Sequence, residues 1–92
     1  MEVLVVDDNK FDNQKLAASF PQDSVSSARN LQDAARILNE AKRWPDLVVV
    51  DAMFPMDSNS PPAFMVGAFL DMLENVSARK EQALPDVILV SG

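Results

Sequence analysis

Three short aliphatic runs, each followed by a polar residue, constrain the fold of this 92-residue chain more than any other feature. The runs are VLVV, LVVV and VILV, at residues 3–6, 47–50 and 87–90. The residues that follow them are Asp7 with Asp8, Asp51, and Ser91. A run without alternation suits a strand that is buried on both faces, as in a parallel sheet.

Helical patterns separate these runs. Asn9 and Asn30 are placed to cap helices over residues 10–19 and 31–43, and a third helix is predicted over residues 63–79. Pro61 or Pro62 suits the first turn of that third helix, after a loop at residues 55–62. A weaker strand is predicted at residues 24–27. The alternation of strands and helices predicts one α/β domain with a doubly wound parallel sheet.

Composition narrows the function classes. The net charge is −6 and no stretch concentrates Lys or Arg, so nucleic acid and anionic membranes are poor partners. The chain contains no Cys and no His, which excludes thiolate chemistry and the commonest general base and zinc ligand. No signal peptide or membrane span is predicted, because Met1 leads directly into a strand and the longest uncharged apolar stretch is residues 63–70. We therefore expect a cytoplasmic protein.

The acids after the strands predict a cation site. The carboxyl ends of parallel strands meet at one edge of a sheet, so Asp7, Asp8 and Asp51 should converge if the first and third strands are neighbours. Oxygen ligands without His or Cys favour a hard cation, Mg²⁺ before Zn²⁺. Asp51 could then act as a nucleophile that forms an acyl phosphate, and Ser91 could donate its hydroxyl to a phosphoryl oxygen.

Each of these residues also has an ordinary structural explanation. An Asp after an aliphatic strand is more often a loop cap than a nucleophile, and an Asp-Asp pair before a helix often only compensates the helix dipole. Ser91 alone carries almost no information. The prediction of a phosphorylation site depends on the combination of these residues.

Four segments together resemble the receiver domain of two-component response regulators. They are VLVVDDN, ARNLQDAARIL, PDLVVVDAMFPMDS and PDVILVSG, and the resemblance covers essentially the whole chain. It implies a flavodoxin-like sheet with strand order 2-1-3-4. It also implies that Asp51 is the phosphoacceptor, that Asp8, Asp7 and the Met53 carbonyl hold Mg²⁺ with Asp51, and that Ser91 is the switch hydroxyl.

The resemblance further implies partners and an incomplete domain. The phosphodonor would be a sensor histidine kinase or a histidine phosphotransfer protein, and the chain would be a signalling switch and not a metabolic enzyme. In the family a fourth helix, a fifth strand ending in Lys and a fifth helix follow, whereas this chain stops at Gly92. We therefore expect residues 1–92 to form a receiver that is truncated before those elements, and we expect a possible homodimer through its open sheet.

Other functions remain open at this point. A degenerate receiver would act as an interaction or self-association scaffold without phosphorylation. A haloacid dehalogenase-like phosphohydrolase would use Asp51 as nucleophile, but it needs an acid/base Asp where Met53 stands. A flavodoxin-like FMN site would meet acidic residues after the first strand, and a nicotinamide site lacks the G-x-G-x-x-G motif.

Overall fold

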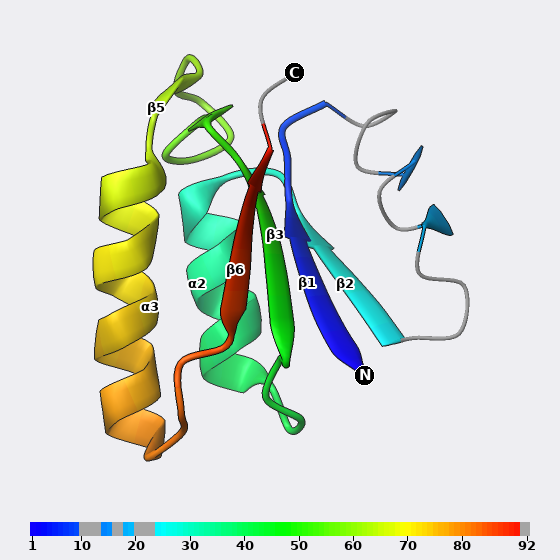
Figure 1. The fold of residues 1–92 in the computed structure, drawn as a ribbon. Coiled ribbons are helices and arrows are strands. Elements are labelled where there is room, and N and C mark those ends of the chain that lie inside the picture. The colour runs from blue at the N-terminus through cyan, green and yellow to red at the C-terminus, as the bar shows by residue number, and fades with distance from the viewer. Residues whose placement is uncertain (10–13, 16–17, 20–23, 91–92) are drawn as a thin grey trace.

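The computed structural model describes residues 1–9, 14–15, 18–19 and 24–90 (Figure 1). The helix predicted over residues 10–19 lies largely outside this part of the chain. Within it, Gln14, Lys15 and Ala18 are helical, and the Ser19 N–H donates to the Lys15 carbonyl at 3.2 Å. No helix in the described ranges is long and apolar enough to span a bilayer.

Four parallel strands form the main sheet in the order β2-β1-β3-β6, as predicted from the family resemblance. The strands are β1 (Glu2–Val6), β2 (Ser24–Ala28), β3 (Leu47–Asp51) and β6 (Asp86–Val90). β1 and β3 are the central strands, and their aliphatic runs are buried on both faces. The unalternating apolar pattern therefore predicted burial on both faces correctly for β1 and β3. It is wrong for β6, which carries the same pattern but lies exposed at the edge of the sheet.

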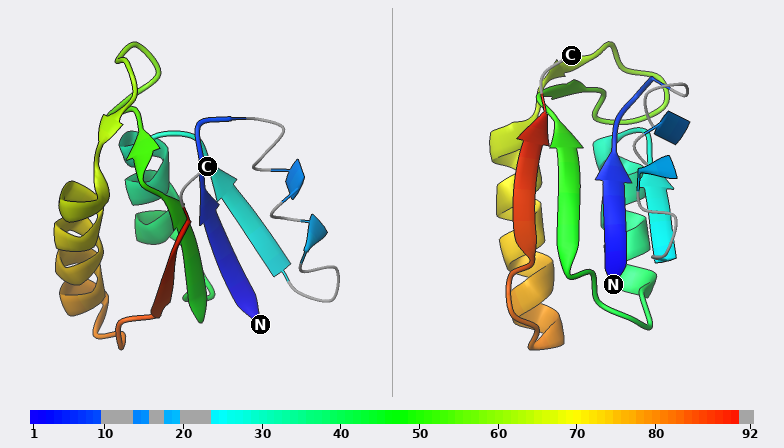
Figure 2. Two further views of the ribbon diagram at one scale, coloured as in Figure 1. Left: turned by 45° about the horizontal axis from the view of Figure 1, so that its top comes forward. Right: turned by 45° about the vertical axis from the view of Figure 1, so that its right-hand side comes forward.

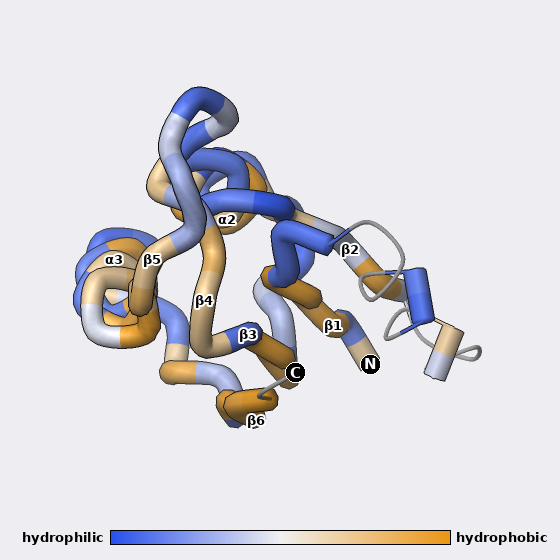
Figure 3. The backbone as a smooth tube through the Cα atoms, turned by 90° about the horizontal axis from the view of Figure 1, so that it is seen from above, coloured by the Kyte–Doolittle hydropathy of each residue, from blue (hydrophilic) through white to orange (hydrophobic). Residues whose placement is uncertain are grey.

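Both faces of the central strands belong to the core. On one face, Leu4 and Val50 pack with residues of two helices, α2 (Leu31–Glu40) and α3 (Val66–Lys80). On the other face, Val3, Val5 and Val49 form a second buried cluster. Figures 2 and 3 show α2 and α3 side by side on the first face, with β6 at one edge of the sheet.

Helix α2 begins as predicted but ends early. The Asn30 side-chain oxygen accepts the Asp33 N–H at 2.7 Å, which confirms Asn30 as the N-cap. The helix was expected to reach residue 43, but it ends at Glu40 and Ala41 is extended. The ammonium of Lys80, at the end of α3, donates to the Leu38 and Ala41 carbonyls at 2.9 and 2.8 Å. A cation from another helix thus binds carbonyl groups where α2 ends.

The prediction for the start of the third helix is wrong. Ala63 and Phe64 form β5 (Ala63–Phe64), which pairs antiparallel with β4 (Met53–Phe54), so α3 begins only at Val66 and neither Pro61 nor Pro62 lies in its first turn. The buried Phe54 ring packs edge to face on Phe69, with centroids 6.3 Å apart. This packing and the strand pairing keep the chain extended where helix propensity alone favoured a helix. The loop at residues 55–62 stands as predicted.

Candidate functional site

Three carboxylates meet at the carboxyl ends of the two central strands. Because Val6 pairs with Val50 in the register, the acids that follow these residues reach the same edge of the sheet. Asp7, Asp8 and Asp51 each offer an oxygen atom, and these atoms all lie within 4.8 Å of one another. The predicted convergence of the three acids is confirmed.

The three acids differ in their surroundings. Asp7 is only 3% exposed; its N–H donates to the Ala28 carbonyl at 3.0 Å, and its carboxylate accepts the Asn9 N–H at 2.9 Å. Asp8 and Asp51 are partly exposed. Asp7 is therefore held by the backbone, whereas Asp8 and Asp51 are open to a ligand.

This arrangement fits a hard divalent cation. Like charges so close repel one another, so a bound cation would relieve the repulsion among the three carboxylates. The donor set consists of oxygen atoms, which Mg²⁺ prefers. The donor set of Asp7, Asp8 and Asp51 thus fits Mg²⁺ in its chemistry, and binding of the ion stays a prediction.

The predicted carbonyl ligand belongs to Met53, two residues after Asp51. The Met65 N–H donates to the Ala52 carbonyl at 3.4 Å, which makes Met53 and Phe64 the non-hydrogen-bonded pair of the β4–β5 hairpin. In this register the Met53 carbonyl does not accept a hydrogen bond from the opposite strand of the hairpin. A role for that carbonyl in metal binding stays a prediction.

Ser91 lies outside the residues that the structure describes. Val90, the residue before it, pairs with Asp51 in the register of β3 and β6. The Val90 carbonyl also accepts the Ala52 N–H at 3.2 Å. The role of Ser91 stays a prediction from the sequence.

The loop after β4 is hydrogen-bonded to the start of α2. The Leu31 and Gln32 N–H groups donate to the Pro55 and Met56 carbonyls, each at 2.9 Å. The first N–H groups of a helix have no acceptor within the helix. Here the loop after β4 supplies carbonyl acceptors for two of these N–H groups. No sequence signal predicts these bonds, because both acceptors are backbone atoms.

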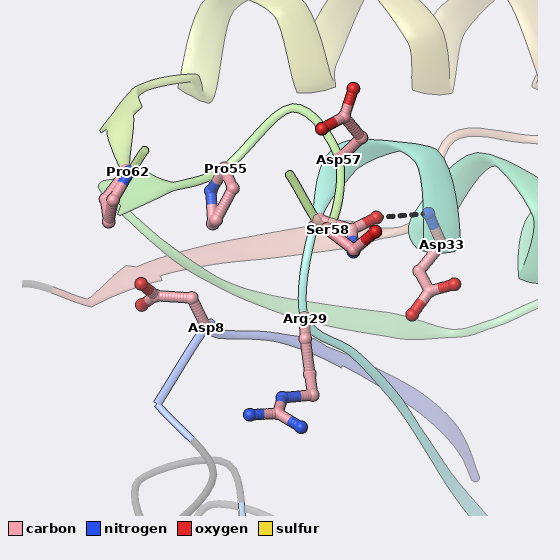
Figure 4. A pocket seen from close by; sticks show the side chains of 8 residues that line it. Asp8, Arg29, Asp33, Pro55, Asp57, Ser58 and Pro62 are labelled. Atoms are coloured by element: carbon pink, nitrogen blue, oxygen red, sulfur yellow. Dashed lines mark hydrogen bonds between the residues drawn. The ribbon is translucent and has the colours of Figure 1, made fainter. Parts of the chain in front are cut away.

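A pocket of about 430 Å³ opens beside Asp8 (Figure 4). Its lining combines the ends of β1 and β2 with the start of α2 and the loop after β4, through Asp8, Arg29, Asn30, Asp33, Pro55, Asp57, Ser58 and Pro62. Hydrogen bonds from the Asn59 N–H and the Ser60 hydroxyl lower the pKa of Asp57. Sequence reasoning missed Arg29, which no motif singles out and which reaches the site only because β1 and β2 are neighbours.

Comparison with known proteins agrees with this fold. No family model and no curated protein matches the chain, whereas solved structures do. The non-phosphorylated HemR receiver domain from Leptospira biflexa superposes with a TM-score of 0.64 at 18% identity, covering 98% of this chain and 63% of that receiver domain. The MaeR response regulator bound to beryllium trifluoride has a TM-score of 0.65 at 22% identity, covering 100% of this chain and 67% of MaeR.

A response regulator receiver domain from Clostridium thermocellum is similar as well, with a TM-score of 0.63 at 22% identity. The alignment covers 99% of this chain and 64% of that protein. This chain thus spans about two thirds of the length of these structures. Its strand order and the helices on its sheet match theirs. The chain therefore has the flavodoxin-like fold of response regulator receiver domains.

Proposed function

We propose that this chain is the phosphoacceptor module of a two-component phosphorelay, with Asp51 as the residue that is phosphorylated. The observation that carries the proposal is the group of three carboxylate oxygens within 4.8 Å, at the carboxyl ends of neighbouring strands in a receiver fold. Ligands of open α/β sheets bind at this edge, so the cluster lies where the fold favours a site. The receiver neighbours support the same role.

The proposed roles follow from the positions of the side chains. Asp51 is the partly exposed acid at the end of β3, so its oxygen can attack an incoming phosphorus atom. Asp8, Asp7 and the Met53 carbonyl would hold Mg²⁺ together with Asp51. When bound, Mg²⁺ would neutralise the charge of the phosphoryl oxygens. Ser91 would donate its hydroxyl to one of those oxygens.

The proposed donor is a phosphohistidine on a sensor kinase or phosphotransfer protein. The donor ring is protonated on its other nitrogen, so when the P–N bond breaks with its electron pair going to the ring, neutral imidazole leaves and a P–O bond to Asp51 forms. These 92 residues contain no His, so the phosphohistidine lies outside them. The proposal makes the chain a signalling switch and not a metabolic enzyme, and it keeps a cytoplasmic location as our expectation.

Phosphate labelling from acetyl phosphate tests the proposal. We expect labelling of the native chain that requires Mg²⁺ and that Asp51→Asn abolishes. The matched control is Asp71→Asn, which removes an exposed acid of α3 and should leave labelling unchanged. A folded native chain that takes up no label, or an Asp51→Asn variant that labels normally, would refute the proposal.

A second candidate is a degenerate receiver that self-associates without phosphorylation. The observation that favours it is the exposure of β6, where Ile88 and Leu89 are 48% and 54% exposed. Magnesium affinity separates the two candidates, because a scaffold has no need of a cation at the three acids. Isothermal titration with Mg²⁺ should show binding that Asp8→Asn weakens if the first proposal holds.

A further inference from the structure

We propose that the first turn of α2 positions the Met53 carbonyl as a ligand of the cation, and that binding of the cation in turn stabilises the contact between this turn and the loop after β4. The inference rests on the proposed function, in which the Met53 carbonyl and the three acids hold Mg²⁺. It adds a positioning element for that site and a thermodynamic coupling between the site and α2. The hydrogen bonds between α2 and the loop carry the argument.

The residues on either side of Met53 are fixed by contacts with other elements. The Ala52 N–H donates to the Val90 carbonyl at 3.2 Å, and the Ala52 carbonyl accepts the Met65 N–H at 3.4 Å. Phe54 is fully buried in the core. The chain is therefore anchored both before and after Met53.

The Met53 carbonyl is the group of β4 that is left for a ligand. Successive carbonyls of a strand point to opposite sides, and the Ala52 carbonyl is bonded on the β5 side, so the Met53 carbonyl faces away from β5. No hydrogen bond from a described residue engages it. Figures 2 and 3 show β4 between β5 and the end of β1. The carbonyl therefore lies on the side of β4 toward β1, from which Asp7 and Asp8 follow.

The start of α2 fixes the loop after β4. The Leu31 N–H donates to the Pro55 carbonyl at 2.9 Å. The Gln32 N–H donates to the Met56 carbonyl at the same distance. The Asn30 side chain accepts the N–H of the third helical residue at 2.7 Å, so the first two N–H groups are left for the loop. Loss of these two bonds would release the chain directly after β4, and with it the carbonyl that β4 offers.

The coupling between the two places is reciprocal. A loop that is bonded to α2 holds the Met53 carbonyl in place, so a cation binds this state more tightly than a state in which the loop is open. By thermodynamic linkage, the bound cation favours the bonded loop by the same factor. Groups that orient a metal ligand change metal affinity about tenfold or more, so we expect a coupling of about tenfold.

Leu31→Pro tests the loop bonds with little change to the helix. Proline is favoured at the first helical position, and Asn30 before it is extended (φ −155°, ψ 171°), which suits the residue before a proline. The substitution removes the N–H that binds Pro55, whereas Leu31→Ala keeps this N–H and shortens the side chain. In isothermal titration we expect Leu31→Pro to weaken Mg²⁺ binding about tenfold and Leu31→Ala to change it by less than about twofold. Lys80→Met, which loosens the other end of α2, should leave the Mg²⁺ affinity unchanged.

Amide hydrogen exchange in the native chain, followed by NMR, measures the reverse effect. Saturating Mg²⁺ should slow the exchange of the Leu31 and Gln32 N–H groups about tenfold. The exchange of the Gln82 N–H, which binds the Ser77 carbonyl at the end of α3, should not change. This measurement needs no variant, so it decides the inference even where Leu31→Pro does not fold.

Two results would overturn the inference. One is unchanged exchange at Leu31 and Gln32 in a native chain that binds Mg²⁺, and the other is equal Mg²⁺ affinity of Leu31→Pro and Leu31→Ala. A native chain that binds no Mg²⁺ would instead refute the metal site of the proposed function.

Discussion

At the residue scale, Asp57 shows how one side chain organises the loop beside the site. Its carboxylate accepts hydrogen bonds from the Asn59 N–H and the Ser60 hydroxyl, and these bonds lower its pKa below the ordinary 3.8. A lowered folded pKa means that the contribution to stability is present above pH 3.8 and is lost as the pH falls through the folded value. The turn should therefore persist at neutral pH and loosen only in acid.

Carboxyl carbon NMR during an acid titration checks this expectation. The Asp57 signal should titrate below pH 3.8, and Ser60→Ala should move its midpoint upward because one donor to the carboxylate is lost. A midpoint at or above 3.8 in the native chain would contradict the role given to the two hydrogen bonds.

At the element scale, Lys80 joins the ends of both helices. Its ammonium donates to the Leu38, Asn39 and Ala41 carbonyls at 2.9, 3.4 and 2.8 Å and lies 5.5 Å from the Trp44 ring centroid. The Trp44 indole N–H in turn donates to the Ala83 carbonyl at 2.9 Å. The connections before β3 and before β6 are thereby held together.

Replacing Lys80 tests this link. Lys80→Met keeps most of the aliphatic stem but leaves the carbonyls at the end of α2 without their donor, so we expect a loss of about 1–3 kcal/mol in the free energy of unfolding. Arg79→Met, at an exposed neighbouring position, should cost less than about 0.5 kcal/mol. Urea unfolding measures the free energy of unfolding of both variants. Equal losses in the two variants would show that the hydrogen bonds of Lys80 to the α2 carbonyls do not stabilise the fold.

At the scale of the whole molecule, the open surface is β6. Val87, Ile88 and Leu89 are 38%, 48% and 54% exposed, and among the described strands β6 pairs only with β3. Its sequence DVILV has no Lys or Pro that would protect an edge from pairing. We therefore propose that two copies of the 92-residue chain associate through this strand.

Sedimentation velocity over a range of concentrations tests self-association. The native chain should show a concentration-dependent increase in sedimentation coefficient, and Ile88→Lys should remove it by placing a charge in the middle of the edge. Asn75→Lys adds the same charge on the exposed side of α3 and should leave association unchanged. A native chain that remains monomeric at every concentration would be inconsistent with this use of β6.

Local patterns explain why much of the fold was predictable. Two Pro-Asp pairs, at residues 45–46 and 85–86, precede β3 and β6 and share a structural role. The Asp46 N–H donates to the Glu2 carbonyl at 2.8 Å, and the Asp86 N–H donates to the Asp46 carbonyl at 3.1 Å. The two pairs therefore align the starts of β1, β3 and β6, which is why both aliphatic runs follow at the same level of the sheet.

The sequence by itself determined the alternation of strands and helices, the Asn30 cap, and the delivery of Asp7, Asp8 and Asp51 to one edge. These features depend on periodicity, on local hydrogen bonding and on the direction of parallel strands, all of which can be read from neighbouring residues. Only the tertiary structure decided the β4–β5 hairpin, the early end of α2 and the place of Arg29 in a pocket with Asp8. Each depends on contacts between distant residues, such as Phe54 with Phe69 or Lys80 with Leu38, and no local pattern encodes those contacts.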